Sequence, residues 1–239
     1  MAENSTNRDS ESPRIEVSED GPYLVEGNIP VVRKIQVVTD QGEPVAWEKV
    51  QSIEMKPGDA FCRCGQSHQK PFCDGTHCEI IFDGTETADP RPSTERQVRL
   101  PGGRQIIVKR DYSLCTEAGF CGNRNGTIET MLEHVDDPGV LSQVIAMIER
   151  CPSGSYTYTM HEDDPDIEPD LPIQVAVVTE MTDDGPIMGP LWVTGNIPVQ
   201  RADGQPLETR NRVTLCRCGL SHNKPLCDGE HRRQCVRED

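Results

Sequence analysis

The sequence predicts an α+β chain in which two small β-rich units flank a module that contains both helix and strand. Three observations carry this prediction. A segment of 16 residues, 62–77, returns at 216–231 with twelve identical positions. Around each copy, short Val- and Ile-rich runs are separated by Gly and Pro, which is typical of β-strands and turns. Between the copies, two strand-like runs lie on either side of a helical apolar pattern.

The duplication extends beyond the 16-residue segment and defines the two outer units. Residues 21–31 parallel residues 189–199, and a Gly-x-Pro turn at Gly42 returns at Gly204. Each copy is therefore a whole small β-rich unit with a cysteine loop. We place the two units at residues 20–85 and 173–239.

The middle unit, residues 104–160, reads strand, cysteine loop, helix, strand. Gln105–Lys109 is a β-branched run, and Tyr156–Met160 is a second strand that can pair with it. Asp137, followed by Pro, provides an N-cap and a first helical residue. Cys151, again followed by Pro, ends the helix. The apolar stripe of this helix is formed by Val140, Leu141, Val144, Ile145 and Ile148.

The duplicated segment has the spacing of a metal site. Cys62 and Cys64 are two residues apart, so an extended segment points both sulfurs to one side. Cys73 and His77 are four residues apart and would share one face of a helix, with Asp74 in its first turn. Two such pairs suit a two-iron, two-sulfur cluster with one pair per iron. They also suit a single tetrahedral zinc ion.

Both copies resemble the CDGSH iron–sulfur domain, also called the NEET family, with the pattern C-x-C-x2-[ST]-x3-P-x-C-D-G-[SAT]-H. The first copy fits throughout, and the second departs only at Glu230, a position that is not a ligand in the family. The resemblance implies a 2Fe-2S cluster in each copy and packing of the two copies as an intrachain pseudo-dimer. The cofactor-binding, metal-ligating residues that it implies are Cys62, Cys64, Cys73, His77, Cys216, Cys218, Cys227 and His231.

The cysteines of the middle unit are Cys115, Cys121 and Cys151, the last within Cys-Pro-Ser-Gly. This arrangement resembles divergent single-cluster ferredoxins, except that Ala118 stands at the middle ligand position of the usual loop. Three thiolates favour a 3Fe-4S cluster, or a 4Fe-4S cluster with one ligand that is not Cys. The alternative is a ferredoxin-like fold whose three cysteines are reduced and bind nothing.

Composition limits the class of protein. Modules this small bury little apolar surface and often need metal for stability, and aromatic residues make up only 4% of the chain. The eleven cysteines are odd in number and clustered in ligand patterns, and no apolar signal segment opens the chain. We therefore expect reduced thiols in a cytoplasmic setting. Cys78 and Cys235 remain unassigned and are expected to be partly buried thiols.

The chain is strongly acidic, with a formal net charge of −16. This charge argues against nucleic acid as a partner. It is consistent with docking on the basic surface of a reductase or oxidase, and equally with solubility alone. Residues 1–19 read as a disordered acidic tail and residues 161–172 as an acidic linker. No apolar stretch is long enough to span a membrane.

Two functions are compatible with these features. The first is electron transfer through two 2Fe-2S clusters and a third cluster in the ferredoxin-like unit. The second is iron–sulfur cluster transfer to an apo-acceptor, or redox and pH sensing, by labile His-ligated clusters. A zinc-stapled interaction protein is a third, weaker interpretation. We expect no catalytic activity of the chain's own and a monomer, since the two copies can satisfy their pairing internally.

Overall fold

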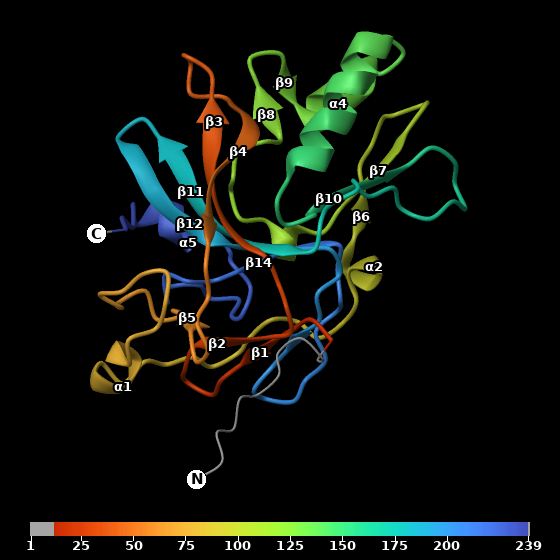
Figure 1. The fold of residues 1–239 in the computed structure, drawn as a ribbon. Helices are drawn as coiled ribbons and strands as arrows, with labels where there is room; N and C mark the ends of the chain where they lie inside the picture. Colours follow the sequence, from red (N-terminus) through yellow and green to blue (C-terminus); the bar gives the residue numbers. More distant parts are fainter. Residues whose placement is uncertain (1–11, 239) are drawn as a thin grey trace.

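The structure is a computed structural model, and it describes residues 12–238 (Figure 1). The first outer unit, with the residues directly before it, contains the strands β1 (Arg14–Val17), β2 (Tyr23–Glu26), β3 (Val31–Val38), β4 (Pro44–Ile53) and β5 (Ala60–Phe61). The second contains β11 (Gln174–Thr182), β12 (Gly185–Thr194), β13 (Val199–Gln200) and β14 (Arg212–Leu215). The chain is thus mixed helix and sheet, as predicted.

The two outer units exchange strands, which confirms the predicted intrachain pseudo-dimer. One sheet has the order β13-β1-β2-β5, and the other has the order β14-β12-β11-β3-β4. Ile15 of β1 pairs with Val199 in parallel, and Val175 of β11 pairs with Val31 in the same manner. Each sheet therefore contains strands from both units, so neither sheet is complete without the other half of the chain.

The main core lies between these two sheets and is built by both units. Ile15 and Tyr23 from the first unit pack in one apolar cluster with Val177 and Leu191 from the second. All four side chains are fully buried. Because each unit alone is small, this shared core is the way in which either of them buries enough apolar surface to be stable.

The predicted disordered tail over residues 1–19 is wrong for its last part. Residues 1–11 lie outside the described residues, but Arg14–Val17 form strand β1. The side chains of Ile15 and Val17 alternate with polar neighbours and point into the shared core. This alternation is a strand pattern, and it is masked in the sequence by the acidic residues around it.

The middle unit has the predicted order of elements. Its strands are β6 (Val98–Arg99), β7 (Ile107–Arg110), β8 (Gly122–Asn123), β9 (Gly126–Thr127) and β10 (Tyr156–Thr159). Its α-helices are α3 (Ile128–Met131) and α4 (Pro138–Arg150), with short 3-10 helices at Tyr112–Leu114 and Leu132–His134. β7 and β10 pair antiparallel, as predicted.

Helix α4 confirms the sequence signals for its start and its apolar face. The carboxylate of Asp137 accepts hydrogen bonds from the backbone N–H groups of Gly139 (2.7 Å) and Val140 (3.4 Å). Val144 and Ile148 are fully buried in the core of the middle unit, together with Tyr156. The helix ends at Arg150, and Cys151 adopts an extended conformation before Pro152.

The middle unit is held against the outer units by polar contacts. Arg212 of β14 is fully buried and donates hydrogen bonds to the carbonyl oxygens of Cys151 (2.9 Å) and Tyr156 (3.4 Å). On another side, Gln36 of β3 donates to the carbonyl of Ala118 (2.7 Å). These bonds anchor both cysteine-bearing loops of the middle unit on the large sheet.

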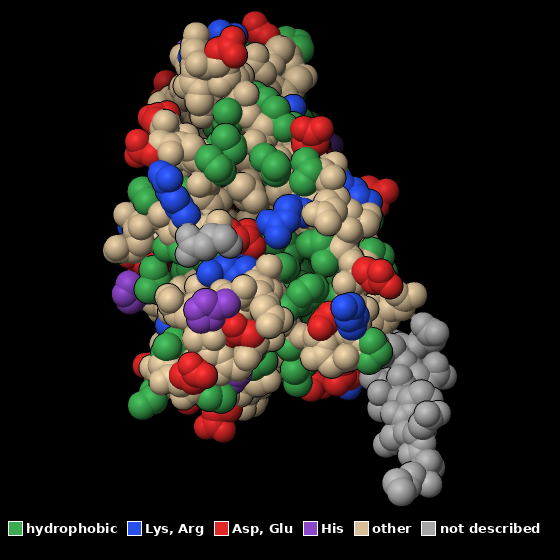
Figure 2. All heavy atoms as spheres, turned by 60° about the vertical axis from the view of Figure 1, so that its left-hand side comes forward, with side chains coloured by type: hydrophobic (Ala, Val, Ile, Leu, Met, Phe, Trp, Pro, Cys, Tyr) green, Lys and Arg blue, Asp and Glu red, His purple; other side chains and the backbone are tan. Residues whose placement is uncertain are grey.

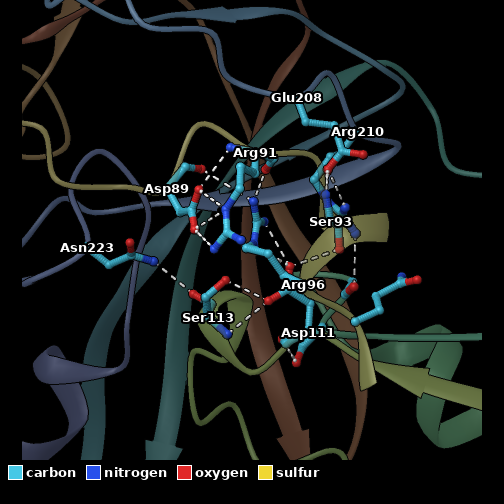
Figure 3. Close-up of polar contacts among 12 residues, drawn as sticks. Asp89, Arg91, Ser93, Arg96, Asp111, Ser113, Glu208, Arg210 and Asn223 are labelled. Atoms are coloured by element: carbon cyan, nitrogen blue, oxygen red, sulfur yellow. Dashed lines mark hydrogen bonds and ion pairs between the residues drawn. The ribbon is translucent and has the colours of Figure 1, made fainter. Parts of the chain in front are cut away.

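The connection from the first unit to the middle unit runs past the second unit. It carries α2 (Ser93–Arg96), and Arg96 forms an ion pair of 2.8 Å with the buried Asp111 (Figure 3). Asp111 also accepts hydrogen bonds from Ser93 Oγ (2.9 Å) and Ser113 Oγ (2.6 Å). The backbone carbonyl of Ser113 in turn accepts from Asn223 Nδ2 of the second unit at 2.8 Å.

The remaining helices, α1 (Thr76–Glu79) and α5 (Glu230–Arg233), follow the duplicated cysteine loops. The predicted acidic linker, residues 161–172, lies against the middle unit, where Asp166 forms an ion pair of 2.7 Å with Lys109. Within residues 12–238, no helix is long and apolar enough to cross a bilayer.

Candidate metal centres

Each duplicated loop brings its four predicted ligands together as two pairs. In the first copy, Cys62 Sγ lies 3.7 Å from Cys64 Sγ, and Cys73 Sγ lies 3.3 Å from His77 Nδ1. In the second copy, the corresponding distances are 3.7 Å between Cys216 and Cys218 and 3.4 Å between Cys227 and His231. The two copies begin 154 residues apart in the sequence, and each forms the same two pairs.

Cys73 and His77 come together through a different backbone conformation from the helix that their spacing predicted. α1 begins only at Thr76, so Cys73 and Asp74 precede the helix, and Gly75 turns the chain with φ 93°. Asp74 accepts hydrogen bonds from the backbone N–H groups of His68 (2.8 Å) and Thr76 (3.1 Å). Its carboxylate thus closes the loop around Cys73, and the conformation of Gly75 requires a residue without Cβ.

The spacing within each pair suits two ligands of one metal ion. A tetrahedral ion with bonds of about 2.3 Å separates its ligands by roughly 3.8 Å, which is close to the separation within each pair. Among residues 12–238, no group of three or more His, Cys, Asp or Glu side chains is arranged to hold a single metal ion.

In each pair of neighbouring cysteines, the surroundings favour the thiolate form of one thiol. The hydrogen bond shared with Cys64 is the largest cause that lowers the pKa of Cys62, to about 6, against the effect of burial. The bond shared with Cys218 likewise lowers the pKa of Cys216 to about 6. The second thiol of each pair has a raised pKa because it acts as the donor. Thiolates are the form that binds metal.

The two duplicated loops touch each other through two glycines. A Cβ on Gly65 would lie 2.7 Å from the carbonyl carbon of Cys218, and one on Gly219 would lie 2.9 Å from that of Cys64. Tyr23 of the first unit also donates a hydrogen bond to the carbonyl of Cys216 at 2.7 Å. The two sites are therefore neighbours across the pseudo-twofold relation.

The two sites differ in burial. All four predicted ligands of the second site are buried, including His231. In the first site Cys62 and Cys64 are buried, but Cys73 and His77 are partly exposed. The first site thus presents its Cys–His pair toward solvent, whereas the second site is enclosed.

The predicted ligands of the middle unit lie in a polar setting. Arg110 donates to Cys115 Sγ at 3.9 Å, and Cys151 Sγ lies 3.5 Å from Ser153 Oγ. Burial raises the pKa of Cys121, and the nearby thiols of Cys151 and Cys115 raise it further. The structure therefore gathers the three cysteines in one region. Ala118, at the missing ligand position, is buried.

The middle cysteine loop lies directly against the second duplicated loop. Glu117, between Cys115 and Cys121, forms an ion pair with Arg233 of α5. A Cβ on Gly229 would lie 3.0 Å from the carbonyl oxygen of Thr116. A surface cavity at this junction has a volume of about 330 Å³ and is lined by Cys115, Glu117, Asn223, Asp228 and Arg233, among others.

Comparison with family models agrees with this arrangement. A model described as iron-binding zinc finger CDGSH type matches residues 20–78 and 188–232, and a model described as divergent 4Fe-4S mono-cluster matches residues 102–161. The chain therefore contains two CDGSH-type iron-binding regions that flank a divergent 4Fe-4S mono-cluster region. Neither the curated proteins nor the solved structures provide a significant match. The boundaries of the units stay predictions.

The arginine inside each Cys-Arg-Cys of the CDGSH regions has a structural role that the sequence reading missed. Arg63 is buried and donates to the carbonyls of Ser18 (3.0 Å) and Gly84. Arg217 is buried as well and donates to the carbonyls of Gly189 (2.7 Å) and Val178 (3.0 Å). Both copies have an arginine between two predicted cysteine ligands. This repetition was the signal in the sequence that could have indicated the role.

In the second CDGSH region a buried carboxylate contacts the predicted histidine ligand. Glu180 Oε2 lies 3.2 Å from His231 Nε2 and 2.7 Å from Arg232 Nη1. Burial would raise the pKa of Glu180, but hydrogen bonding to His231 and the charge of Arg232 outweigh burial and lower it. Sequence reasoning missed this residue, since no local spacing relates it to the cysteine loop.

The cysteines outside the predicted sites are exposed, which corrects the expectation that they are partly buried. Cys78 lies in α1 directly after His77, Cys235 lies two residues beyond the end of α5, and both are exposed. All eleven cysteines are free thiols within the described residues.

Glu238 stabilises the second CDGSH region through Arg217, and this predicts a pH-dependent stability. Burial would raise the pKa of Glu238, but Arg217 and Arg33 outweigh it and lower the pKa to about 2. The stabilisation is therefore complete above the unfolded-state pKa of about 4.3 and is lost as the pH falls toward 2. We expect Glu238→Gln to lower the free energy of unfolding by about 2 kcal/mol at pH 7, with solvent screening taken into account.

The measurement is urea unfolding of both proteins between pH 7 and pH 3. The difference between wild type and Glu238→Gln should shrink by about 1.4 kcal/mol per pH unit well below pH 4. Glu162→Gln is the matched control, because the Glu162–Arg99 ion pair is exposed on both sides and should contribute less than about 1 kcal/mol. A difference for Glu238→Gln that is constant with pH would contradict the prediction.

Proposed function

We propose that this protein transfers electrons between redox proteins through two 2Fe-2S clusters and a third cluster in the middle unit. The proposed ligands of the 2Fe-2S clusters are Cys62, Cys64, Cys73 and His77, and Cys216, Cys218, Cys227 and His231. Cys115, Cys121 and Cys151 are proposed to hold the third cluster, a 3Fe-4S or 4Fe-4S cluster. The 4Fe-4S family match over this unit supports a cluster there.

The residues of the chain fit such clusters. Each CDGSH loop offers its thiols and imidazole as two pairs, and the pKa of the first thiol of each pair is lowered to about 6. An iron–sulfur cluster, when bound, supplies reversible one-electron chemistry whose potential depends on ligand charge and burial. The buried pairs exclude water, and the loops hold the imidazole Nδ1 atoms toward the cysteines.

The observation that carries the proposal is that the three sites lie in a contact series. The loop of the first site touches that of the second at Gly65 and Gly219. The second loop touches the middle cysteine loop at Gly229 and through the ion pair of Arg233 with Glu117. The second site is enclosed between the other two, which suits an internal relay. The partly exposed first and middle sites suit exchange with partners.

The surface supports a redox protein as partner. Acidic side chains are spread over the face shown in Figure 2, and the basic ones lie among them singly or in small groups. With a net charge of −16, such a surface suits docking on a basic patch of a reductase or oxidase and disfavours nucleic acid. We propose no catalytic activity of its own, a monomeric state and a cytoplasmic location, where free thiols persist.

The test is to count iron, acid-labile sulfide and zinc in the anaerobically purified protein and to follow its visible spectrum through a cycle of reduction and oxidation. We expect about seven to eight irons per chain, the sum of two 2Fe clusters and one 3Fe or 4Fe cluster, with reversible bleaching. About four irons would leave only the CDGSH pair as clusters. A colourless protein with two zinc ions would overturn the proposal.

Cluster transfer to an apo-acceptor is the alternative, and one observation favours it. Cys73 and His77 of the first site are partly exposed, so an acceptor could reach this Cys–His pair. The second site is enclosed and offers no such access. Rapid loss of two irons per chain to an apo-ferredoxin, with the other clusters retained, would favour transfer from the first site. Stable clusters that cycle reversibly would favour electron transfer.

A further inference from the structure

The second CDGSH site contains a polar arrangement that the first site lacks. Glu180 of β11 is fully buried, and its carboxylate faces His231 Nε2 at 3.2 Å while Nδ1 faces Cys227 Sγ at 3.4 Å. Arg232 donates to the same carboxylate oxygen at 2.7 Å and to the carbonyl of Met181 at 3.3 Å. The second carboxylate oxygen, Oε1, is buried without a hydrogen-bond partner among the described residues. The ion pair of Glu180 with Arg232 therefore lies next to the imidazole of His231.

The two copies share strand register only near the start of their hairpins. Ile15 pairs with Val25 in the first unit as Val175 pairs with Val193 in the second. β1 ends at Val17, whereas β11 has a bulge between Val177 and Thr179 and continues to Thr182, so no residue of β1 corresponds to Glu180. Asp20, five residues after Ile15 as Glu180 is after Val175, lies in the turn that follows β1. Asp20 Oδ1 accepts a hydrogen bond from the backbone N–H of Gly84 at 2.7 Å and is thus used elsewhere.

As a result, the two predicted histidine ligands have different surroundings. Among residues 12–238, the ring of His77 has no carboxylate partner, and its one side-chain hydrogen bond is to Cys73. His77 is partly exposed, whereas His231 is 2% exposed. The candidate ligands and their spacing are the same in both copies, and the carboxylate beside His231 comes from strand β11, outside the loop.

We propose that Glu180 is a positioning residue for the second site, which holds His231 with Nδ1 toward the cysteines and lowers the reduction potential of the cluster bound there below that of the first. The inference rests on the proposed function, because it assumes that both CDGSH sites hold clusters. A carboxylate that accepts a hydrogen bond from Nε2–H selects the tautomer with a free Nδ1 lone pair and makes the imidazole a more basic ligand.

The direction of the effect follows from charge. A more basic ligand and a nearby buried anion both favour the oxidised, less negative cluster, so they lower its potential. Arg232 opposes this effect only in part, because its guanidinium is about one quarter exposed while Glu180 is fully buried. Electrons are then expected to move from the enclosed second site to the exposed first site.

The experiment uses the full-length protein, purified anaerobically, with iron and sulfide counted before each titration. Potentials are measured by redox titration monitored with EPR. His77→Cys in all samples removes nitrogen coupling from the first site, so that the second is the remaining His-ligated centre. Glu180→Gln removes the charge at constant shape, and Asp20→Asn is the control that removes a carboxylate charge from the first unit.

We expect Glu180→Gln to raise the potential of the His-ligated cluster, to change its nitrogen hyperfine coupling in pulsed EPR, and to speed iron loss to a chelator by about 10- to 100-fold. Asp20→Asn should leave the potential and coupling of that cluster unchanged. Arg232→Gln should shift the potential in the opposite direction, downward, because the carboxylate loses its cation. These opposite signs are not expected from a residue with a merely structural role.

Several results would overturn the inference. An unchanged potential in Glu180→Gln with full iron content would do so while leaving the proposed function intact. If Glu180→Gln loses its cluster, an unchanged or raised potential in Arg232→Gln is decisive against the inference. A wild-type protein without iron–sulfur absorbance would overturn the proposed function, and the inference with it.

Discussion

Gly65→Ala should destabilise the protein by more than about 3 kcal/mol and loosen both CDGSH sites together. The added Cβ would lie 2.7 Å from the carbonyl carbon of Cys218, so one of the two loop backbones has to move. The positive φ of 77° adds about 1 kcal/mol of backbone strain for a residue with Cβ. Because the contact is between the two sites, the damage reaches the second copy as well.

The measurement is chemical unfolding of the purified protein, with iron counted per chain. Gly58→Ala is the matched control, since Gly58 has φ 91° in the same unit but no atom within 4 Å of an added Cβ. The control should show only the strain of about 1 kcal/mol. The difference between the two variants measures the contact between loops. Equal effects would show that the loops separate easily and do not stabilise one another.

Arg212→Met should cost about 3–5 kcal/mol and detach the middle unit from the large sheet. Arg212 is fully buried and donates to the carbonyl oxygens of Ile148 (3.0 Å), Glu149 (2.7 Å) and Cys151 (2.9 Å). It also forms an ion pair of 3.0 Å with Glu168. Without it, the carbonyls at the end of α4 lose their donor in a buried place, and the loop of Cys151 loses its anchor.

Urea unfolding and hydrogen exchange check this prediction. Amide protons of residues 148–156 should exchange faster in Arg212→Met, and iron content should fall by the share of the middle unit while the CDGSH clusters remain. Arg99→Met is the control, because Arg99 is exposed and forms an ion pair with the exposed Glu162, so that its loss should cost less than about 1 kcal/mol. Similar costs in the two variants would contradict the role assigned to Arg212.

Local patterns predicted the parts of this protein that depend on neighbours in the chain. The apolar spacing and the Asp-Pro start located α4, and its observed range, Pro138–Arg150, agrees with both signals. The repeated cysteine loops predicted the pairs of possible ligands, and the comparisons identify the same regions as CDGSH. The pattern was right even where its reason was wrong, since Cys73 and His77 meet across a glycine turn and not along one helix.

Patterns were less informative where polar residues surround a strand or where burial depends on packing. Arg14–Val17 were assigned to a disordered tail, because a run of four residues with two apolar side chains is weak beside acidic neighbours. Cys78 and Cys235 were expected to be partly buried and are exposed. In both cases the deciding contacts, or their lack among the described residues, come from distant parts of the chain.

Local spacing and a motif that occurs twice were enough to predict the fold class, the duplication and the candidate metal ligands. The exchange of strands between the units, the contact of the middle loop with the second site, and the approach of Glu180 to His231 across 51 positions of sequence are visible only in the folded chain. The reason is that two motifs with twelve of sixteen positions in common have nearly the same local preferences. What makes their sites different is the packing around them, which places one histidine beside a buried carboxylate and leaves the other near solvent.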